Sequence, residues 1–160
     1  MKESSIYEVV NPRELEDIMK HLSKIESMSC FRDKSVREEF ARKQIKFGHV
    51  YAQKHGDIPI AVACFYCNDK ESRIAYITAL VLGDELGISK GVTMIEFARK
   101  FIGLCRQNDM KTIRLEVANT NSRARRLYEH VGFTYTGEEK KDSSYMEMPL
   151  DEFEAVFCHA

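Results

Sequence analysis

Apolar residues in the first third of the chain follow a strand pattern once and a helical pattern twice. Residues 6–10 (Ile-Tyr-Glu-Val-Val) have the composition of a short strand. Asn11 and Pro12 then form a typical helix start, with asparagine as the cap and proline in the first turn. The apolar stripe of this helix consists of Leu15, Ile18, Met19, Leu22 and Ile25. Residues 26–34 interrupt the pattern, and a second helix is predicted from about Ser35. Its buried face is expected to contain Val36, Phe40 and Ile45.

The hydrophobic period changes to that of strands in the middle of the chain. Extended runs at residues 50–53 and 58–67 are separated by His55-Gly56-Asp57, which is typical of a hairpin turn. After a polar turn at residues 68–72, residues 73–82 form a third run that is nearly all apolar. Strands that are buried on both faces have this composition, so we expect this strand at the centre of a covered sheet.

Helices and strands alternate in the second half. A long helix is predicted from apolar residues at helical spacing, namely Met94, Ile95, Ala98, Phe101, Ile102 and Cys105. Residues 111–117 alternate as a strand does, with Leu115 and its apolar neighbours on one face and Arg114 and Glu116 on the other. One face of the next helix contains Ala124, Leu127, Tyr128 and Val131, and Gly132 is the expected stop. Two more strands are predicted at residues 134–136 and 144–150, with a short amphipathic tail at 151–160.

The predicted order of elements is therefore β-α-α-β-β-β-α-β-α-β-β. Successive hairpins favour antiparallel pairing in the first half, while the helix between residues 82 and 112 permits a parallel crossover. We therefore expect an α/β fold with a mixed sheet and helices on both sides. A length of 160 residues predicts a single domain over residues 1–160.

Composition and charge exclude several classes of protein. Lysine and arginine number 24 against 25 aspartates and glutamates, and this balance argues against a general nucleic-acid binder. The longest apolar run, residues 74–82, is about half the length that spans a bilayer, so we expect no membrane partner. Five cysteines without a visible secretion signal fit reduced thiols and a cytoplasmic location. Cys64 and Cys67 match C-x-x-C, but no further ligand pair accompanies them. We therefore interpret them as apolar fillers and expect no metal site.

The segment between residues 83 and 92 is the first candidate for a ligand site. It follows an apolar strand and opens a helix, and helix N-termini suit anions such as a pyrophosphate. Gly87 and Gly91 would let the backbone approach such a ligand closely. The segment matches neither the P-loop nor the dinucleotide-binding motif. An ordinary turn before a helix remains the alternative.

Residues 115–133 provide the second and more specific signal. Asn121, Ala124, Leu127, Tyr128, Gly132 and Phe133 match the spacing N-x-x-A-x-x-L-Y-x-x-x-G-F. In this pattern the sequence resembles the GNAT family of N-acetyltransferases. The similarity covers about residues 74–133, which would form the cofactor half. The resemblance implies a GNAT-like fold with a splay between the fourth and fifth strands, and acetyl-CoA as the co-substrate.

The resemblance also implies which residues bind the cofactor. The family pattern continues from an L-x-V strand end to R/Q-x-x-G-x-G/A, whose positions here are Leu86, Ser89 and Gly91. Leu86 and Ser89 depart from it, so we expect acetyl-CoA to bind with one charge-assisted hydrogen bond fewer, while Lys90 would restore charge. The expected cofactor-binding residues are Ala79, Leu80, Val81, Gly87, Ile88, Ser89, Lys90, Gly91, Val92, Asn121 and Tyr128.

Catalysis in this family is a direct attack of a neutral amine on the thioester. Glu116 occupies the position where some relatives carry a general base, and its alternative is an exposed strand glutamate. Tyr128 is the expected general acid, although its spacing also fits packing on the apolar stripe. Asp69 and Glu71 are weaker base candidates. Asn121 would contact the cofactor, cap the helix, or do both.

The acceptor is expected to be a primary amine of a small molecule, an amino sugar or a protein N-terminus. Its site would lie between residues 26–34, the splay, and the last hairpin around Tyr135 and Tyr145. The expected acceptor-binding residues are Cys30, Phe31, Arg32 and Asn119. A non-catalytic acyl-CoA-binding module is the alternative function. An adaptor for nucleic acid would rest only on Arg123, Arg125 and Arg126, which are interpreted more simply as a solvated helix face. The sequence leaves open whether the chain forms a homodimer.

Overall fold

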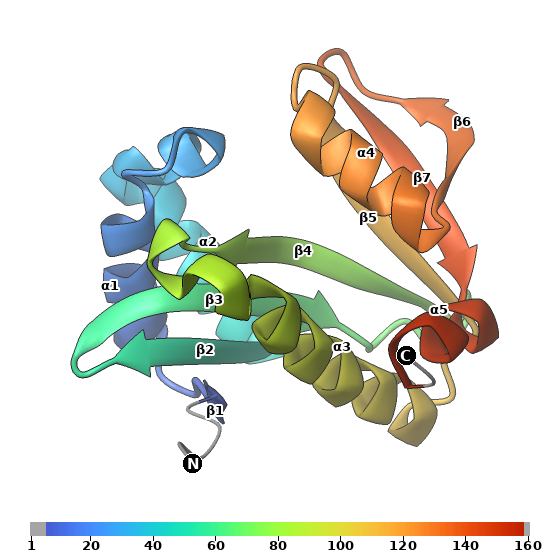
Figure 1. Cartoon of the computed structure of the whole chain (residues 1–160), viewed down its shortest axis with the longest axis horizontal. Helices are drawn as coiled ribbons and strands as arrows, with labels where there is room; N and C mark the ends of the chain where they lie inside the picture. Colours follow the sequence, from blue (N-terminus) through green and yellow to red (C-terminus); the bar gives the residue numbers. More distant parts are fainter. Residues whose placement is uncertain (1–5, 159–160) are drawn as a thin grey trace. The chain divides into compact units, whose positions relative to one another are not determined.

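A computed structural model describes residues 6–158 of the chain. The first half contains β1 (Ile6–Glu8), α1 (Pro12–Leu22), the 3-10 segment η1 (Glu26–Arg32), α2 (Lys34–Phe47), β2 (His49–His55), β3 (Ile58–Tyr66) and β4 (Ile74–Leu82) (Figure 1). The second half contains the 3-10 segment η2 (Asp84–Ser89), α3 (Lys90–Gln107), β5 (Thr112–Ala118), α4 (Ser122–Val131), β6 (Thr134–Glu139), β7 (Ser143–Pro149) and α5 (Leu150–Cys158). The predicted order is confirmed, and the expected tail is helix α5.

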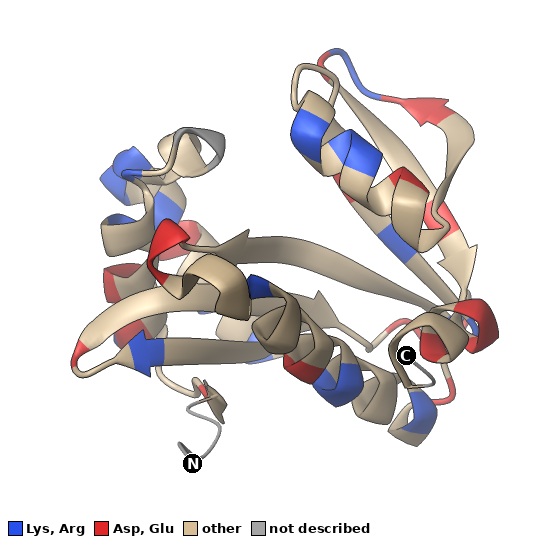
Figure 2. Ribbon diagram, viewed as in Figure 1, with Lys and Arg blue, Asp and Glu red and all other residues tan. Residues whose placement is uncertain are grey.

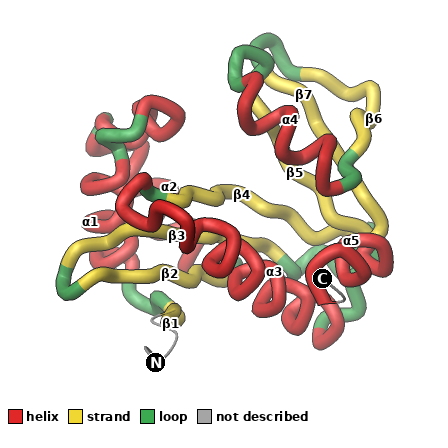
Figure 3. The backbone as a smooth tube through the Cα atoms, in the orientation of Figure 1, coloured by secondary structure: helices red, strands yellow, loops and turns green. Residues whose placement is uncertain are grey.

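The strands form a seven-stranded mixed sheet in the order β1-β2-β3-β4-β5-β7-β6 (Figure 3). The pairs β1–β2, β2–β3, β5–β7 and β6–β7 are antiparallel. Strand β4 pairs with β5 in parallel, from Ile74–Thr112 to Ile77–Leu115. The expected parallel crossover through α3 is therefore confirmed, and β4 takes the predicted central place in the order. The expected burial of β4 on both faces is wrong, because only Ala75 and Val81 of this strand are buried and the others are half-buried or exposed.

The chain divides into two compact units by its internal contacts. Within the described residues, unit 1 comprises residues 6–66 and 79–97, and unit 2 comprises residues 67–78 and 98–158. Strand β4 and helix α3 contribute to both units, because the boundary falls inside each of them.

The core of unit 1 combines α1 with the first strands. The predicted stripe of α1 is buried at Leu15, Ile18, Met19 and Leu22, and it packs with β2 and β3 side chains such as Val50 and Val62. Asn11 caps the helix, with its side-chain oxygen accepting a hydrogen bond from the Arg13 N–H. Local sequence signals thus fix this helix at its start and along its buried face.

Helix α2 corrects part of the prediction. Val36 is exposed, and the fully buried residues of the helix are Arg37, Ala41 and Gln44. The polar pair is buried because it donates to backbone carbonyls: Arg37 Nη1 lies 2.9 Å from the Phe31 oxygen. Gln44 Nε2 lies 3.0 Å from the Phe65 oxygen. Phe40 and Ile45 are partly buried against the core, as expected, so the error is confined to Val36 and to the buried donors, which a hydrophobic pattern assigns to the solvent side.

Replacing Gln44 with leucine is expected to lower the free energy of unfolding by about 1–3 kcal/mol, because the buried Phe65 carbonyl loses this donor. Urea denaturation followed by circular dichroism measures the change. Gln107→Leu, an exposed change on α3, is the matched control and should stay within about 0.5 kcal/mol of wild type. Equal stabilities of the two variants would contradict the role assigned to Gln44.

The core of unit 2 forms on one face of β5. Ile113, Leu115 and Val117 are buried as predicted, and Met148 and Met146 pair with the first two across β7. Helix α5 is tied to α3 by Arg106, which forms ion pairs with Asp151 and Glu154. The opposite face of β5, with Arg114 and Glu116, thus remains available for polar contacts. Among residues 6–158, no helix is both long and apolar enough to span a membrane.

Candidate active site

The predicted cofactor segment lies at the end of β4 in unit 1. Ala79 and Leu80 are half-buried, Val81 is buried, and the chain then turns at Gly83, whose N–H donates to the Ile60 carbonyl. The expected loop is in fact the 3-10 segment η2, and α3 begins at Lys90. A local hydrogen-bonded turn therefore leads into the helix.

Gly87 interrupts η2 with φ 53° and ψ −124°, a conformation that L-residues with side chains avoid. A Cβ atom at Gly87 or Gly91 would have no neighbour within 4 Å. Ile88, Ser89 and Val92 beside them are exposed. The first turn of α3 therefore presents open surface next to backbone N–H groups, as an anion site requires.

The charges of this segment differ from those of a simple phosphate site. Leu86 is buried, so the position where the family carries arginine or glutamine belongs here to the core. Lys90 Nζ lies 3.0 Å from the Asp84 carboxylate, which is almost fully exposed. Such exposed pairs contribute little, so an anionic ligand can replace Asp84 as the partner of Lys90. Thr93, buried in the next turn, donates to Gln53 at 2.7 Å and fixes α3 against β2.

Tyr128, the expected acid, lies on α4 in unit 2. Its ring packs edge-to-face on Phe133, with centroids 5.8 Å apart, so the packing alternative is correct for the ring. Among the described residues of unit 2, no group hydrogen bonds to the Tyr128 hydroxyl. Burial raises the pKa of Tyr128 above its ordinary value, which keeps the hydroxyl protonated and able to donate.

Glu116, the expected base, projects from β5 on the face opposite Leu115. It is directly opposite Tyr145 of β7, and its carboxylate lies 2.9 Å from Lys140 Nζ. Sequence reasoning did not single out Lys140, because one lysine in a polar hairpin loop has no distinguishing pattern.

Asn121 and Asn119 both have structural partners. Asn121 Oδ1 accepts from the Ala124 N–H at 3.1 Å and so caps α4, as the capping alternative predicted. Asn119 Oδ1 accepts from the Ser144 hydroxyl at 2.6 Å. Arg125 donates to the Asn119 carbonyl and to the Tyr135 hydroxyl, so this arginine has a structural role.

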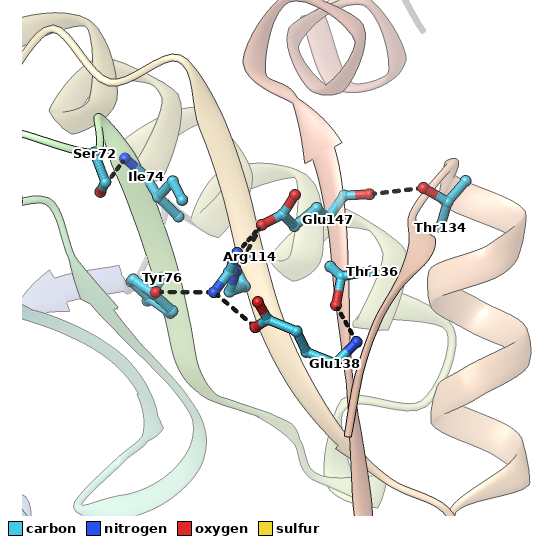
Figure 4. Close-up of polar contacts among 8 residues, drawn as sticks. All are labelled: Ser72, Ile74, Tyr76, Arg114, Thr134, Thr136, Glu138 and Glu147. Carbon is cyan, nitrogen blue, oxygen red and sulfur yellow. Dashed lines mark hydrogen bonds and ion pairs between the residues drawn. The ribbon is translucent and has the colours of Figure 1, made fainter. Parts of the chain in front are cut away.

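A second polar network surrounds Arg114 on the same face of β5 as Glu116 (Figure 4). Arg114 Nε donates to Glu147 at 2.6 Å, and Nη1 lies 3.6 Å from Glu138. The guanidinium also lies over the rings of Tyr76 and Tyr145, 5.8 Å from each centroid. Two carboxylates thus fix this cation firmly in place.

The expected acceptor residues Cys30, Phe31 and Arg32 lie at the end of η1 in unit 1. Cys30 and Arg32 are exposed, whereas the Phe31 side chain is buried against Phe40. Arg37 Nη1 donates hydrogen bonds to the backbone carbonyls of Phe31 and Arg32. Arg32 Nε in turn donates to the Ser23 carbonyl at 2.9 Å, so the segment is anchored and the Arg32 guanidinium already has a structural partner.

The weaker base candidates lie in the turn before β4. Asp69 accepts a hydrogen bond from the Ser72 N–H, and hydrogen bonds from Ser72 lower the pKa of its carboxyl. Glu71 is exposed. Asp69 therefore has a turn-forming role.

The five cysteines are free thiols. Cys64 packs in the core of unit 1, and burial raises the pKa of its thiol, while Cys67 Sγ lies 3.9 Å from Cys105 Sγ in unit 2. Within residues 6–158, no group of three or more His, Cys, Asp or Glu side chains could hold a metal ion.

Comparison with solved structures identifies the class of fold, with 331 matching chains. An acetyltransferase from Streptococcus agalactiae is 14% identical with a TM-score of 0.70, covering 93% of this chain and 99% of that chain. An N-acetyltransferase, PaiA, from Thermoplasma acidophilum in complex with coenzyme A is 16% identical with a TM-score of 0.61, covering 91% and 99%. A ribosomal-protein-alanine N-acetyltransferase from Escherichia coli is 19% identical with a TM-score of 0.53, covering 71% and 76%. The chain has the fold of acetyltransferases.

The family itself follows from the sequence. The profile of the Acetyltransferase (GNAT) family matches residues 15–133, about three quarters of the chain. The chain therefore belongs to the GNAT family and is an enzyme of the acyltransferase class. A search of curated protein sequences finds no match.

Proposed function

We propose that the chain transfers an acetyl group from acetyl-CoA to a primary amine by direct attack, with no acyl-enzyme intermediate. The observation that carries this proposal is the open surface at the N-terminus of α3, where a Cβ atom at Gly87, just before the helix, or at Gly91, in its first turn, would have no neighbour within 4 Å. The matching N-acetyltransferase from Thermoplasma acidophilum is a coenzyme A complex, which supports a CoA substrate here.

The residues present fit such a substrate. Residues 87–92 would bind the pyrophosphate through the N–H groups and positive dipole of α3, with Ser89 and Lys90 as side-chain partners. The edge of β4 at residues 79–81 would bind pantetheine through main-chain hydrogen bonds. Asn121 would contact the cofactor in addition to capping α4. Buried Leu86 supplies no charge, so binding would depend mainly on the backbone.

Two side chains of unit 2 would move the protons of the reaction. Glu116 would accept the proton of the attacking amine, since the nitrogen needs a free lone pair to form the new C–N bond. Tyr128 would donate its hydroxyl proton to the departing thiolate when the C–S bond breaks. The raised pKa of Tyr128 supports this role, because the hydroxyl remains protonated at neutral pH.

We further propose that residues 1–160 act as one catalytic domain in a reducing, cytoplasm-like compartment, which the free thiols favour. The net charge of −1 favours a discrete amine acceptor, small-molecule or peptide, over nucleic acid. Cys30, Phe31, Arg32 and Asn119 would contribute to the acceptor site. A non-catalytic acyl-CoA-binding module is the second candidate, which the loss of a charged residue at Leu86 favours.

Acetyl-CoA at about 100 times its dissociation constant is expected to add roughly 2.7 kcal/mol of stability, which raises Tm by about 5–10 °C for a chain of this size. Differential scanning fluorimetry measures the shift, with ATP as a control that lacks pantetheine. Absence of a shift at millimolar acetyl-CoA would contradict both candidate functions. Release of free thiol with a panel of amines then separates the enzyme from the binding module.

A further inference from the structure

The ammonium group of Lys140 in unit 2 contacts a carboxylate and an aromatic ring. The ammonium nitrogen lies 2.9 Å from Glu116 Oε1 and 5.7 Å from the centre of the Tyr145 ring. Glu116 and Tyr145 come from neighbouring strands and are directly opposite each other in the register. A carboxylate beside an aromatic ring is a typical binding arrangement for an organic ammonium group.

The two cations beside Tyr145 differ in how firmly they are held. Arg114 is 19% exposed and is bound by both Glu147 and Glu138. The Lys140 side chain is 61% exposed, and Glu116 is the carboxylate bound to it. Exposed ion pairs of this kind are weak, so Lys140 is the cation that a second ammonium can replace.

The backbone at Lys140 is fixed independently of its side chain. The Lys140 N–H donates to the Ser143 carbonyl at 2.9 Å and closes the turn between β6 and β7. In Figure 2 this connection carries both basic and acidic segments. The side chain can therefore leave Glu116 without disturbing the hairpin.

We propose that Glu116 and Tyr145 form a binding site for the ammonium group of an unbranched alkylamine, and that Lys140 occupies this site until the acceptor displaces it. The inference rests on the proposed function and specifies its substrate class. The Lys140 ammonium contacts Glu116 and Tyr145 at the end of four methylene groups, so an ammonium on an unbranched alkyl chain fits this pair of side chains. An α-amine or a ring amine carries additional bulk next to the nitrogen. The acceptor class is therefore a lysine side chain or an aliphatic diamine.

The pKa of Lys140 agrees with this geometry. Hydrogen bonds to Glu116 and then to Tyr145 raise the pKa of the ammonium, so the site favours the charged form of an amine. An acceptor would thus bind as its ammonium and lose a proton before attack.

The test is isothermal titration calorimetry with 1,5-diaminopentane on the full-length chain. Lys140→Met is expected to lower the dissociation constant about 3- to 10-fold, because the internal competitor is gone. Lys141→Met is the matched control, with the same change of charge at the adjacent exposed position, and should stay within about twofold of wild type. Adding Tyr145→Leu to Lys140→Met should weaken binding again about 2- to 5-fold.

Equal affinities for Lys140→Met and Lys141→Met would overturn the proposal, as would no binding to Lys140→Met. Tighter binding of glucosamine than of the diamine would overturn the substrate class. Stabilisation by acetyl-CoA is measured on the same variants. Its loss in wild type would contradict the proposed function, while the diamine titration still decides on the ammonium site.

Discussion

Tyr128→Phe is expected to lower kcat for amine acetylation by about 100-fold or more, since general acid catalysis contributes roughly 10²- to 10⁴-fold. The dissociation constant for acetyl-CoA should rise by no more than about 10-fold, because an isolated neutral hydrogen bond contributes only about 0.5–1.5 kcal/mol. Stability should also change little. The ring keeps its edge-to-face contact with Phe133, and no hydrogen bond partner of the hydroxyl within unit 2 is lost.

Tyr66→Phe is the matched control. Tyr66 is also half-buried, and burial likewise raises the pKa of its hydroxyl, but it lies on β3 outside the candidate site. Its kcat should equal that of wild type. Stopped-flow detection of free thiol gives kcat, and fluorimetry gives acetyl-CoA binding. Wild-type activity in Tyr128→Phe would show that solvent protonates the thiolate.

The direction of the pKa shift also predicts the alkaline limit of the reaction. A tyrosine acid works below its pKa and fails above it, and burial moves the pKa of Tyr128 upward from 10.0. We therefore expect that, at saturating acceptor, deprotonation of this group removes less than half of kcat up to pH 10. A loss of more than half of kcat below pH 10 that Tyr128→Phe abolishes would contradict the upward shift of this pKa.

Local patterns predicted the fold where a residue's neighbours in sequence determine its environment. The Asn121 cap, the Gly132 stop and the alternation along β5 all depend on contacts within a few residues. The prediction for Val36 is wrong because the buried positions of α2 include Arg37 and Gln44, whose partners are carbonyls of η1 and β3. Hydrophobicity alone does not detect a buried donor whose acceptor is distant in sequence.

In the candidate site, too, contiguous motifs were predictable from the sequence, whereas contacts between residues distant in sequence were not. The motif around Tyr128 is a contiguous pattern, so its position on α4 followed directly. The contact of Lys140 with Glu116 joins residues 24 positions apart through the β5–β7 register, which the sequence does not contain. The burial of Leu86 in the core was also not predicted, because the family carries a cofactor-binding arginine or glutamine at this position.

Gly91→Ala is expected to affect stability and cofactor binding in opposite directions. A Cβ at Gly91 has no neighbour within 4 Å, and alanine is up to about 1 kcal/mol more favourable than glycine in a helix, so Tm should stay equal or rise. The same methyl group would intrude where the substrate's phosphates approach the first turn of α3. Overpacking costs about 1–3 kcal/mol, so the acetyl-CoA dissociation constant should rise roughly 5- to 150-fold.

Gly103→Ala separates these two effects. Gly103 is also in α3, is exposed, and has the same open surroundings, but it lies three turns beyond the candidate site. Its Tm should rise as in Gly91→Ala, and its acetyl-CoA affinity should equal that of wild type. Calorimetric titration of both variants decides the matter. Unchanged affinity in Gly91→Ala would place the phosphates away from the helix N-terminus. A loss of affinity in both variants would show that the glycines act through helix flexibility, so only a loss confined to Gly91→Ala supports direct contact.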